Sequence, residues 1–373
     1  MIDIIFGTRP EAIKLALLAK LCREQFPEKV RVISTGQHKE MLDQVLEWFE
    51  IKPDVDLNIM TANQSLAGLT SICLEKLNEF YATNPKPNLL IVQGDTTTAF
   101  ASALTAFYNK IEVAHVEAGL RTYDKWSPFP EEINRKLIGQ IADLHFAPTQ
   151  MAYDVLANEK IAEKKLYLTG NTVIDALLYS KNKIDEQNYF PQHLEEYYTG
   201  TKSDAKIVLI TGHRRENFGQ GFQDICLAIK TLSQKYPEVS FIYPVHLNPN
   251  VKEVVYELLG DLPNVKLIAP LSYPDFISLM DRSYFILTDS GGVQEEAPSL
   301  GKPVLIMRNN TERGEGVAAG VVKLIGTDAE QIIIESSRLL EEQDYYNSFL
   351  RNQNPYGNGD SSEQIIKLIQ SYV

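Results

Sequence analysis

The sequence has 373 residues and a formal net charge of −13; 44 % of its residues are hydrophobic and 23 % are charged. This composition is typical of a soluble globular protein, and the length predicts two domains of similar size rather than one core. The acidic balance argues against nucleic acid as a partner, because proteins that bind phosphate backbones carry a surplus of Lys and Arg.

No apolar run reaches the ~18 residues that a membrane-spanning helix needs, and no charged-then-apolar leader precedes the first predicted strand. We therefore expect no membrane association and a cytoplasmic location. Cys22, Cys73 and Cys226 are isolated in the sequence, which favours buried thiols over disulfides or ligands. No His or carboxylate spacing indicates a metal site, so we expect no metal and no cofactor.

Apolar runs alternate with helical patterns in two successive series. The first predicts strands at 2–6, 30–34, 88–93, 111–116 and 144–148. The second predicts strands at 205–212, 239–245, 265–269, 284–289 and 302–307. A helix at 10–26 begins with Pro10, whose missing N–H costs nothing in a first turn. Such alternation predicts an α/β protein with two Rossmann-like, doubly wound domains, each with a parallel sheet covered on both faces.

A polar stretch at 181–205 lies between the two series and is the predicted linker, although the domain boundary could fall near Gly170. We expect an N-terminal domain over 1–170 and a second domain over 171–357. The amphipathic end of the chain, residues 358–373, is expected to form a helix that packs back on the first domain.

Ligands of open α/β sheets bind beyond the carboxyl ends of the strands. Charged and polar residues gather at these ends in both series. In the first series they are Arg9, Glu11, Gln37, His38, Asp95 and Glu117, and in the second they are His213 to Asn217, His246 and Ser290 to Gly292. If the two sheets face each other, these groups converge on one cleft.

The segment after the strand at 284–289 has two readings. Gly291 and Gly292 would let a diphosphate approach the backbone amides of a helix start, with Ser290 adding a hydroxyl and Glu295 or Glu296 accepting a ribose diol. Alternatively, the same residues simply cap a helix. Arg9 and Lys14 also have two readings: they bind phosphate, or they belong to a solvated helix start. His115 is either a core histidine or a functional one.

Nine collinear motifs together identify a family. They are GTRPEAIK, TGQHKEMLDQV, GDTTT, HVEAGLRT, PFPEEINR, TGNTVIDAL, TGHRREN, YPVHLNPNV and TDSGGVQEEAPSLGKPVL. They resemble the non-hydrolysing UDP-N-acetylglucosamine 2-epimerase family over almost the whole chain. The resemblance implies two Rossmann-like domains that face a central cleft, in the glycosyltransferase-B arrangement. It also implies a homodimer and the reversible C2 epimerisation of UDP-N-acetylglucosamine to UDP-N-acetylmannosamine, which supplies N-acetylmannosamine for cell-surface polysaccharide.

The motifs also assign expected roles residue by residue. The catalytic residues are expected at Asp95, Glu117, Glu131 and His213. The residues expected to bind the UDP-N-acetylhexosamine are Arg9, Lys14, Arg135, Arg214, Asn217, His246, Phe276, Ser290, Gly291, Gly292, Glu296 and Arg313. Elimination of UDP to a glycal, followed by re-addition, needs carboxylates as acid and base and fixed positive charge on the leaving diphosphate. Which carboxylate acts on which face of C2 stays open.

Two departures from the family pattern bear on binding. Gly314 and Gly316 replace a proline and a small apolar residue, which predicts a looser loop after Arg313. Many bacterial members also bind a second UDP-N-acetylglucosamine as an activator, at a site that involves Gln37, His38, Glu131, Arg214 and His246. Glu40 and Asn63 stand there in place of glutamine and arginine, so we expect weak activation.

Two other enzymes remain as alternatives. A hydrolysing epimerase would release free N-acetylmannosamine, but such relatives diverge at GTRPEAIK. A glycosyltransferase-B enzyme that uses a nucleotide sugar would share the 286–305 signature but would not need Asp95, Glu117 and Glu131 together.

Overall fold

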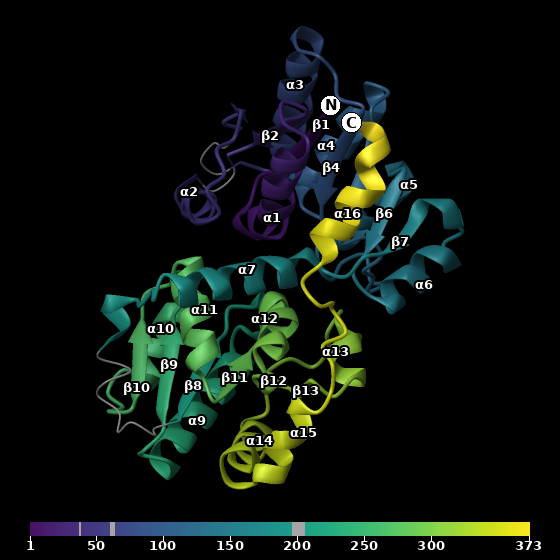
Figure 1. The fold of residues 1–373 in the computed structure, drawn as a ribbon. Helices are drawn as coiled ribbons and strands as arrows, with labels where there is room; N and C mark the ends of the chain where they lie inside the picture. Colours follow the sequence, from purple (N-terminus) through teal and green to yellow (C-terminus); the bar gives the residue numbers. More distant parts are fainter. Residues whose placement is uncertain (37–38, 60–63, 196–205) are drawn as a thin grey trace. The chain divides into compact units, whose positions relative to one another are not determined.

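The structure is a computed structural model that describes residues 1–36, 39–59, 64–195 and 206–373, without the side chains of 39–41. Its contacts divide the chain into two units (Figure 1). Unit 1 comprises Met1–Tyr179 with Tyr356–Val373, and unit 2 comprises Ser180–Pro355. The division falls inside one helix, α7 (Thr172–Glu186), so the predicted linker at 181–205 is wrong at its start, which is helical.

Unit 1 contains a parallel sheet in the order β3-β2-β1-β4-β5-β6-β7. Its strands are β1 (Ile2–Phe6), β2 (Val30–Ser34), β3 (Val55–Asp56), β4 (Leu89–Gln93), β5 (Glu112–Val116), β6 (Leu144–Ala147) and β7 (Leu166–Leu168). Its helices are α1 (Arg9–Gln25), α2 (Lys39–Trp48), α3 (Leu66–Thr83), α4 (Thr97–Tyr108), α5 (Glu131–Ile141), α6 (Gln150–Asn158), the first half of α7, and α16 (Ser361–Ile369). The five predicted strands are confirmed within two residues, whereas β3 and β7 were not foreseen.

Helices cover both faces of this sheet. Helices α3, α4 and α5 pack on one another and share a core with Ile5, Leu90, Val92 and Val113 of the strands. Side chains alternate across a strand, so these residues define one face, and α1, α2 and α16 form the layer on the other (Figure 1). The carboxyl end of the chain therefore belongs to unit 1, where α16 packs against α1.

Unit 2 contains a second parallel sheet, in the order β10-β9-β8-β11-β12-β13. Its strands are β8 (Ile207–Thr211), β9 (Ser240–Pro244), β10 (Val265–Ile268), β11 (Phe285–Thr288), β12 (Val304–Ile306) and β13 (Val322–Leu324). Its helices are α9 (Gln220–Lys235), α10 (Pro249–Leu259), α11 (Tyr273–Arg282), α12 (Gly291–Glu296), α13 (Gly314–Ala318), α14 (Ala329–Glu341) and α15 (Gln343–Leu350). The strand order reverses direction beside β8 and β11, which is where doubly wound sheets bind ligands.

The fold class predicted from the sequence is confirmed: each unit is a Rossmann-like parallel sheet with helices around it. The three cysteines are free and buried, as expected. Within the described part of the chain, no helix combines the length and the apolar character that crossing a membrane requires. The expected looser loop after Arg313 is wrong, because Gly314 and Gly316 lie within α13 and Gly316 is buried.

Candidate active site

Two carboxylates lie at the carboxyl edge of the sheet in unit 1. Asp95 follows β4 and Glu117 follows β5, which is the neighbouring strand. Glu117 accepts hydrogen bonds from Lys14, whose Nζ lies 2.5 Å from Oε2, and from the Gln93 amide. Both side chains of the Lys14–Glu117 pair are largely buried. The backbone of Glu117 is left-handed, with φ of 63°, which is uncommon for a residue with a side chain and typical of functional sites.

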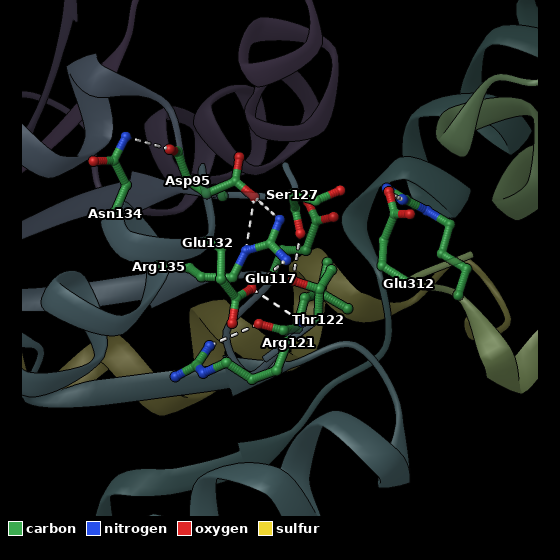
Figure 2. Close-up of polar contacts among 12 residues, drawn as sticks. Asp95, Glu117, Arg121, Thr122, Ser127, Glu132, Asn134, Arg135 and Glu312 are labelled. Atoms are coloured by element: carbon green, nitrogen blue, oxygen red, sulfur yellow. Dashed lines mark hydrogen bonds and ion pairs between the residues drawn. The ribbon is translucent and has the colours of Figure 1, made fainter. Parts of the chain in front are cut away.

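Asp95 is held by α5 (Figure 2). The Arg135 guanidinium donates to Asp95 Oδ2 through both Nη2 and Nε, and Asn134 donates to the Asp95 carbonyl at 2.9 Å. Arg135 was expected to bind substrate. In the structure its side chain pairs directly with Asp95, one of the expected catalytic residues. Glu131 is the first residue of α5 and precedes Arg135 by four, so both lie on the helix face that approaches Asp95. The structure thus places Asp95 and Glu117 after neighbouring strands, and Glu131 at the start of the helix whose Arg135 holds Asp95.

The neighbouring Glu132 has a structural environment. It is fully buried and accepts backbone N–H bonds from Thr122 and Tyr123 at 3.0 and 3.1 Å, and it pairs with Arg135 (Figure 2). The two adjacent glutamates of the PFPEEINR motif therefore have different surroundings. Glu132 anchors the 122–123 backbone, while Glu131 is half-buried at the helix start.

Glu11 joins the loops after β1 and β4. Its Oε2 accepts from the amides of Gly7 and Thr8, and its Oε1 accepts from the Thr96 hydroxyl at 2.6 Å. Thr8 in turn caps α1, which completes a capping box around Arg9 at the helix start. Burial raises the pKa of Glu11, and the hydrogen bonds from Thr96 and Thr8 oppose this. Glu11 thereby fixes the spacing between the Arg9 and Asp95 loops.

His115 is a core histidine. Its Nε2 lies 2.7 Å from the carbonyl oxygen of Gly94, directly before Asp95. Burial lowers the pKa of His115 to about 3, so the ring is neutral at ordinary pH and the Nε2–H donates to Gly94. Its role is to fix the loop that carries Asp95.

Asp289 organises the site in unit 2. Its carboxylate is fully buried at the end of β11 and accepts from the backbone amides of His213 and Arg214 at 2.9 Å each. The side-chain amide of Asn217 donates to the same oxygen at 3.2 Å. Sequence reasoning treated Asp289 as the end of a strand and missed this role. A signal for this role was available, because Asp289 directly follows one predicted strand and the basic segment 213–217 directly follows another.

The expected nucleotide-binding residues also have partners within unit 2. His246 is exposed and its ring stacks on His213, with centroids 5.4 Å apart. Phe276 lies on α11 one turn after Tyr273, whose hydroxyl donates to Glu296 Oε1 at 3.1 Å. Phe276 and Glu296 are therefore both placed near Tyr273.

Arg313 and Glu295 form a buried ion pair, with Nε and Oε1 at 2.7 Å. Glu312 also contacts Arg313, at 2.5 Å, and Arg308, at 3.0 Å. Burial alone would raise the pKa of Glu312, but the Arg313 and Arg308 guanidinium groups outweigh it and hold that pKa well below its usual range. Arg313 was expected to contact the nucleotide, and the structure places its charge between two carboxylates.

Four residues of the expected activator site have no described side chain. Gln37, His38 and Asn63 lie outside the described residues, and Glu40 belongs to α2 but its side chain is not described. Among the described residues, no group of three or more His, Cys, Asp and Glu side chains is arranged to hold a metal ion.

Comparison with known proteins places the chain in a family. The sequence model for UDP-N-acetylglucosamine 2-epimerase matches residues 21–370. A UDP-N-acetylglucosamine 2-epimerase of Campylobacter jejuni is 51 % identical over 375 residues, which cover 98 % of this chain and 96 % of the relative. The Escherichia coli K12 enzyme of the same name is 48 % identical over 368 residues, covering 98 % and 97 %.

Solved structures agree with this comparison. The UDP-GlcNAc 2-epimerase from Neisseria meningitidis bound to UDP-GlcNAc has a TM-score of 0.94 at 47 % identity and covers 99 % of each chain. The enzyme from Methanocaldococcus jannaschii, in complex with UDP-GlcNAc and UDP, has a TM-score of 0.84 at 33 % identity, again with 99 % of each chain covered. The fold and site belong to a class of nucleotide-sugar enzymes with paired Rossmann-like domains. Within it, the chain belongs to the UDP-N-acetylglucosamine 2-epimerase family, which confirms the resemblance noted in the sequence.

Proposed function

We propose that the protein interconverts UDP-N-acetylglucosamine and UDP-N-acetylmannosamine without releasing the free sugar. The observation that carries this proposal is the pairing of two strand-end carboxylates with cations, Glu117 with Lys14 and Asp95 with Arg135. Each cation holds its carboxylate in place at the strand end. An ionised carboxylate can remove the C2 proton or stabilise positive charge at C1.

The reaction needs this arrangement because C2 of the sugar has no adjacent carbonyl to acidify its proton. Departure of UDP from C1 places positive charge beside C2, and a base can then take the proton, leaving a glycal. Re-addition of UDP with proton delivery to the other face gives the epimer. Asp95, Glu117 and Glu131 are the proposed acid, base and charge-stabilising groups. Asp95 and Glu117 lie after neighbouring strands, and Glu131 begins the helix whose Arg135 holds Asp95.

We assign the diphosphate and nucleotide to unit 2. The half-buried side chains of His213 and Arg214 carry or can acquire positive charge at the end of β8. Ser290 begins α12 without using its hydroxyl as a cap, so this hydroxyl suits a phosphate contact. Glu296, held by Tyr273, is the better ribose ligand than Glu295, whose Oε1 is engaged by Arg313. Phe276 would lie against the base.

A hydrolysing epimerase and a glycosyltransferase are the alternatives that the sequence left open, and the family membership argues against the second. Incubation with UDP-N-acetylglucosamine alone, followed by proton NMR, separates the three. We expect a mixture of the two UDP-sugars with no metal, nicotinamide or acceptor added. Accumulation of free N-acetylmannosamine with UDP would support hydrolysis, and an unchanged spectrum would favour a transferase that waits for its acceptor.

The proposal includes three further points that follow from the family resemblance. They are a homodimeric assembly, a cytoplasmic location, and a supply of N-acetylmannosamine for cell-surface polysaccharide. Light scattering of the purified protein tests the first: a mass near twice 42.1 kDa is expected, and a mass of 42.1 kDa contradicts it.

A further inference from the structure

The buried carboxylate of Asp289 connects two neighbouring strands. Asp289 follows β11, and the chain segment that it contacts follows β8, which pairs directly with β11. Its two oxygens accept from the His213 amide at 3.1 and 2.9 Å, and Oδ2 also accepts from the Arg214 amide at 2.9 Å. With the Asn217 amide added, the carboxylate fixes both ends of the 213–217 loop.

The same carboxylate also faces the His213 ring. His213 Nδ1 lies 3.5 Å from Asp289 Oδ1. Among the residues that the structure describes, no Lys or Arg side chain forms an ion pair with Asp289, so its charge is balanced by N–H donors and the imidazole. A carboxylate at Nδ1 favours a proton on that nitrogen and leaves Nε2 for a ligand.

Three charged or titratable groups face His213. Burial lowers the pKa of His213, and the neighbouring Arg214 and the stacked His246 lower it further, while Asp289 raises it. Asp289 is the one group among these that favours the protonated ring. Without it, the imidazole would lose both its anchor and the charge that opposes desolvation.

We propose that Asp289 is a positioning residue that orients His213 and favours its protonated form opposite the departing diphosphate. This inference rests on the epimerase function proposed above, in which a positively charged His213 stabilises the leaving UDP. Asp289 itself touches no substrate and acts only through the His213 side chain and the 213–217 backbone.

The first test uses Asp289→Asn, which keeps the size of the side chain and removes its charge. We expect kcat at about pH 8 to fall by ~10-fold or more, because the imidazole loses both its anchor and the carboxylate that favours its proton. The affinity for UDP should stay within about threefold. The fall in kcat with rising pH should begin at a lower pH than in the wild type, so activity is partly recovered in more acidic buffer. Asp328→Asn, which removes an exposed helix-capping carboxylate of the same unit, is the matched control and should leave kcat unchanged.

The second test is independent of turnover. Nitrogen-15 NMR of the wild-type His213 ring should show the neutral imidazole protonated on Nδ1, and its titration should move to lower pH in Asp289→Asn. A His213 titration that is the same in both proteins would overturn the proposal. So would a loss of kcat that is equal at all pH values, since that is the result of a structural role alone. If wild-type protein fails to epimerise UDP-N-acetylglucosamine, the proposed function fails, while the NMR titration still decides whether Asp289 positions His213.

Discussion

The guanidinium of Arg313 occupies the space where Gly291 would carry a side chain. A Cβ added to Gly291 would lie 2.5 Å from Arg313 Nη1 and 2.6 Å from Cζ. The glycine that the sequence assigns to close ligand approach is thus also required by a buried ion pair with Glu295. The space at Gly292 is different, since an added Cβ meets only Glu296 Oε2, at an ordinary 3.6 Å.

Gly291→Ala should therefore destabilise unit 2 by about 1–3 kcal/mol, the usual cost of overpacking. Displacement of Arg313 would also break its buried ion pair with Glu295. Gly292→Ala is the matched control and should unfold at nearly the wild-type temperature. Calorimetry of the three proteins gives the comparison, and equal melting temperatures for both variants would show that Arg313 moves aside without cost.

The three acids of unit 1 give a second prediction. Asp95→Asn, Glu117→Gln and Glu131→Gln should each lower turnover by at least ~10²-fold, the usual scale for acid–base groups. UDP affinity, measured by calorimetry, should persist because none of the three is assigned to the nucleotide. Glu163→Gln, at an exposed position of the same unit, is the control. Near-normal turnover in any one acid variant removes that residue from the mechanism.

The buried histidines predict how the stability of unit 1 depends on pH. Burial lowers the pKa of His115 to about 3 and that of His145 to about 4, against about 6.5 in an unfolded chain. Between these values the unfolded state binds protons that the folded state does not, so stability falls as pH falls below about 6.5. Each histidine contributes at most ~1.4 kcal/mol per pH unit.

The two tryptophans, Trp48 and Trp126, both belong to unit 1, so their fluorescence in urea follows its unfolding. His145→Phe should reduce the loss of stability between about pH 6.5 and about pH 4.5, because one titrating group is removed. His193→Gln changes an exposed histidine outside unit 1 and should leave the loss as it is. The same pH dependence in His145→Phe as in wild type would contradict the burial of His145 as a neutral ring.

Glu40 and Asn63 predict weak activation by a second UDP-N-acetylglucosamine. A charge-assisted hydrogen bond contributes roughly 1.5–3 kcal/mol, so replacing a cation and adding an anion should weaken binding of the activator by ~10-fold or more. Pure UDP-N-acetylmannosamine should then be converted at once. A reaction that stays silent until a trace of UDP-N-acetylglucosamine is added would show that the activator is still required.

Local patterns in the sequence predicted the long elements well. Apolar runs of five to eight residues became β1, β4 and β8 within two residues, because such strands are buried on both faces. The strands β3, β7 and β13, with two or three residues each, were not predicted, whereas the equally short β12 lies within the predicted apolar run at 302–307.

Relationships between distant residues could not be predicted in the same way. Asp289 fixes amides 75 and 76 positions earlier in the chain, and its place directly after a strand does not show which distant loop it contacts. The crowding of Gly291 by Arg313 likewise depends on how β12 returns the chain beside α12. Arg135 was assigned to substrate because the motif contains it, while its pairing with Asp95 depends on where α5 packs.

In the proposed reaction, the C2 proton leaves the sugar and is replaced by a proton from a second group. The direct measurement is the reaction in heavy water, with UDP-N-acetylglucosamine as the only substrate and proton NMR or mass spectrometry at C2. UDP-N-acetylmannosamine should carry deuterium at C2, and recovered UDP-N-acetylglucosamine should gain it as the mixture approaches equilibrium. Epimerisation over many turnovers with hydrogen retained at C2 in both sugars would contradict the exchange of this proton with separate acid and base groups.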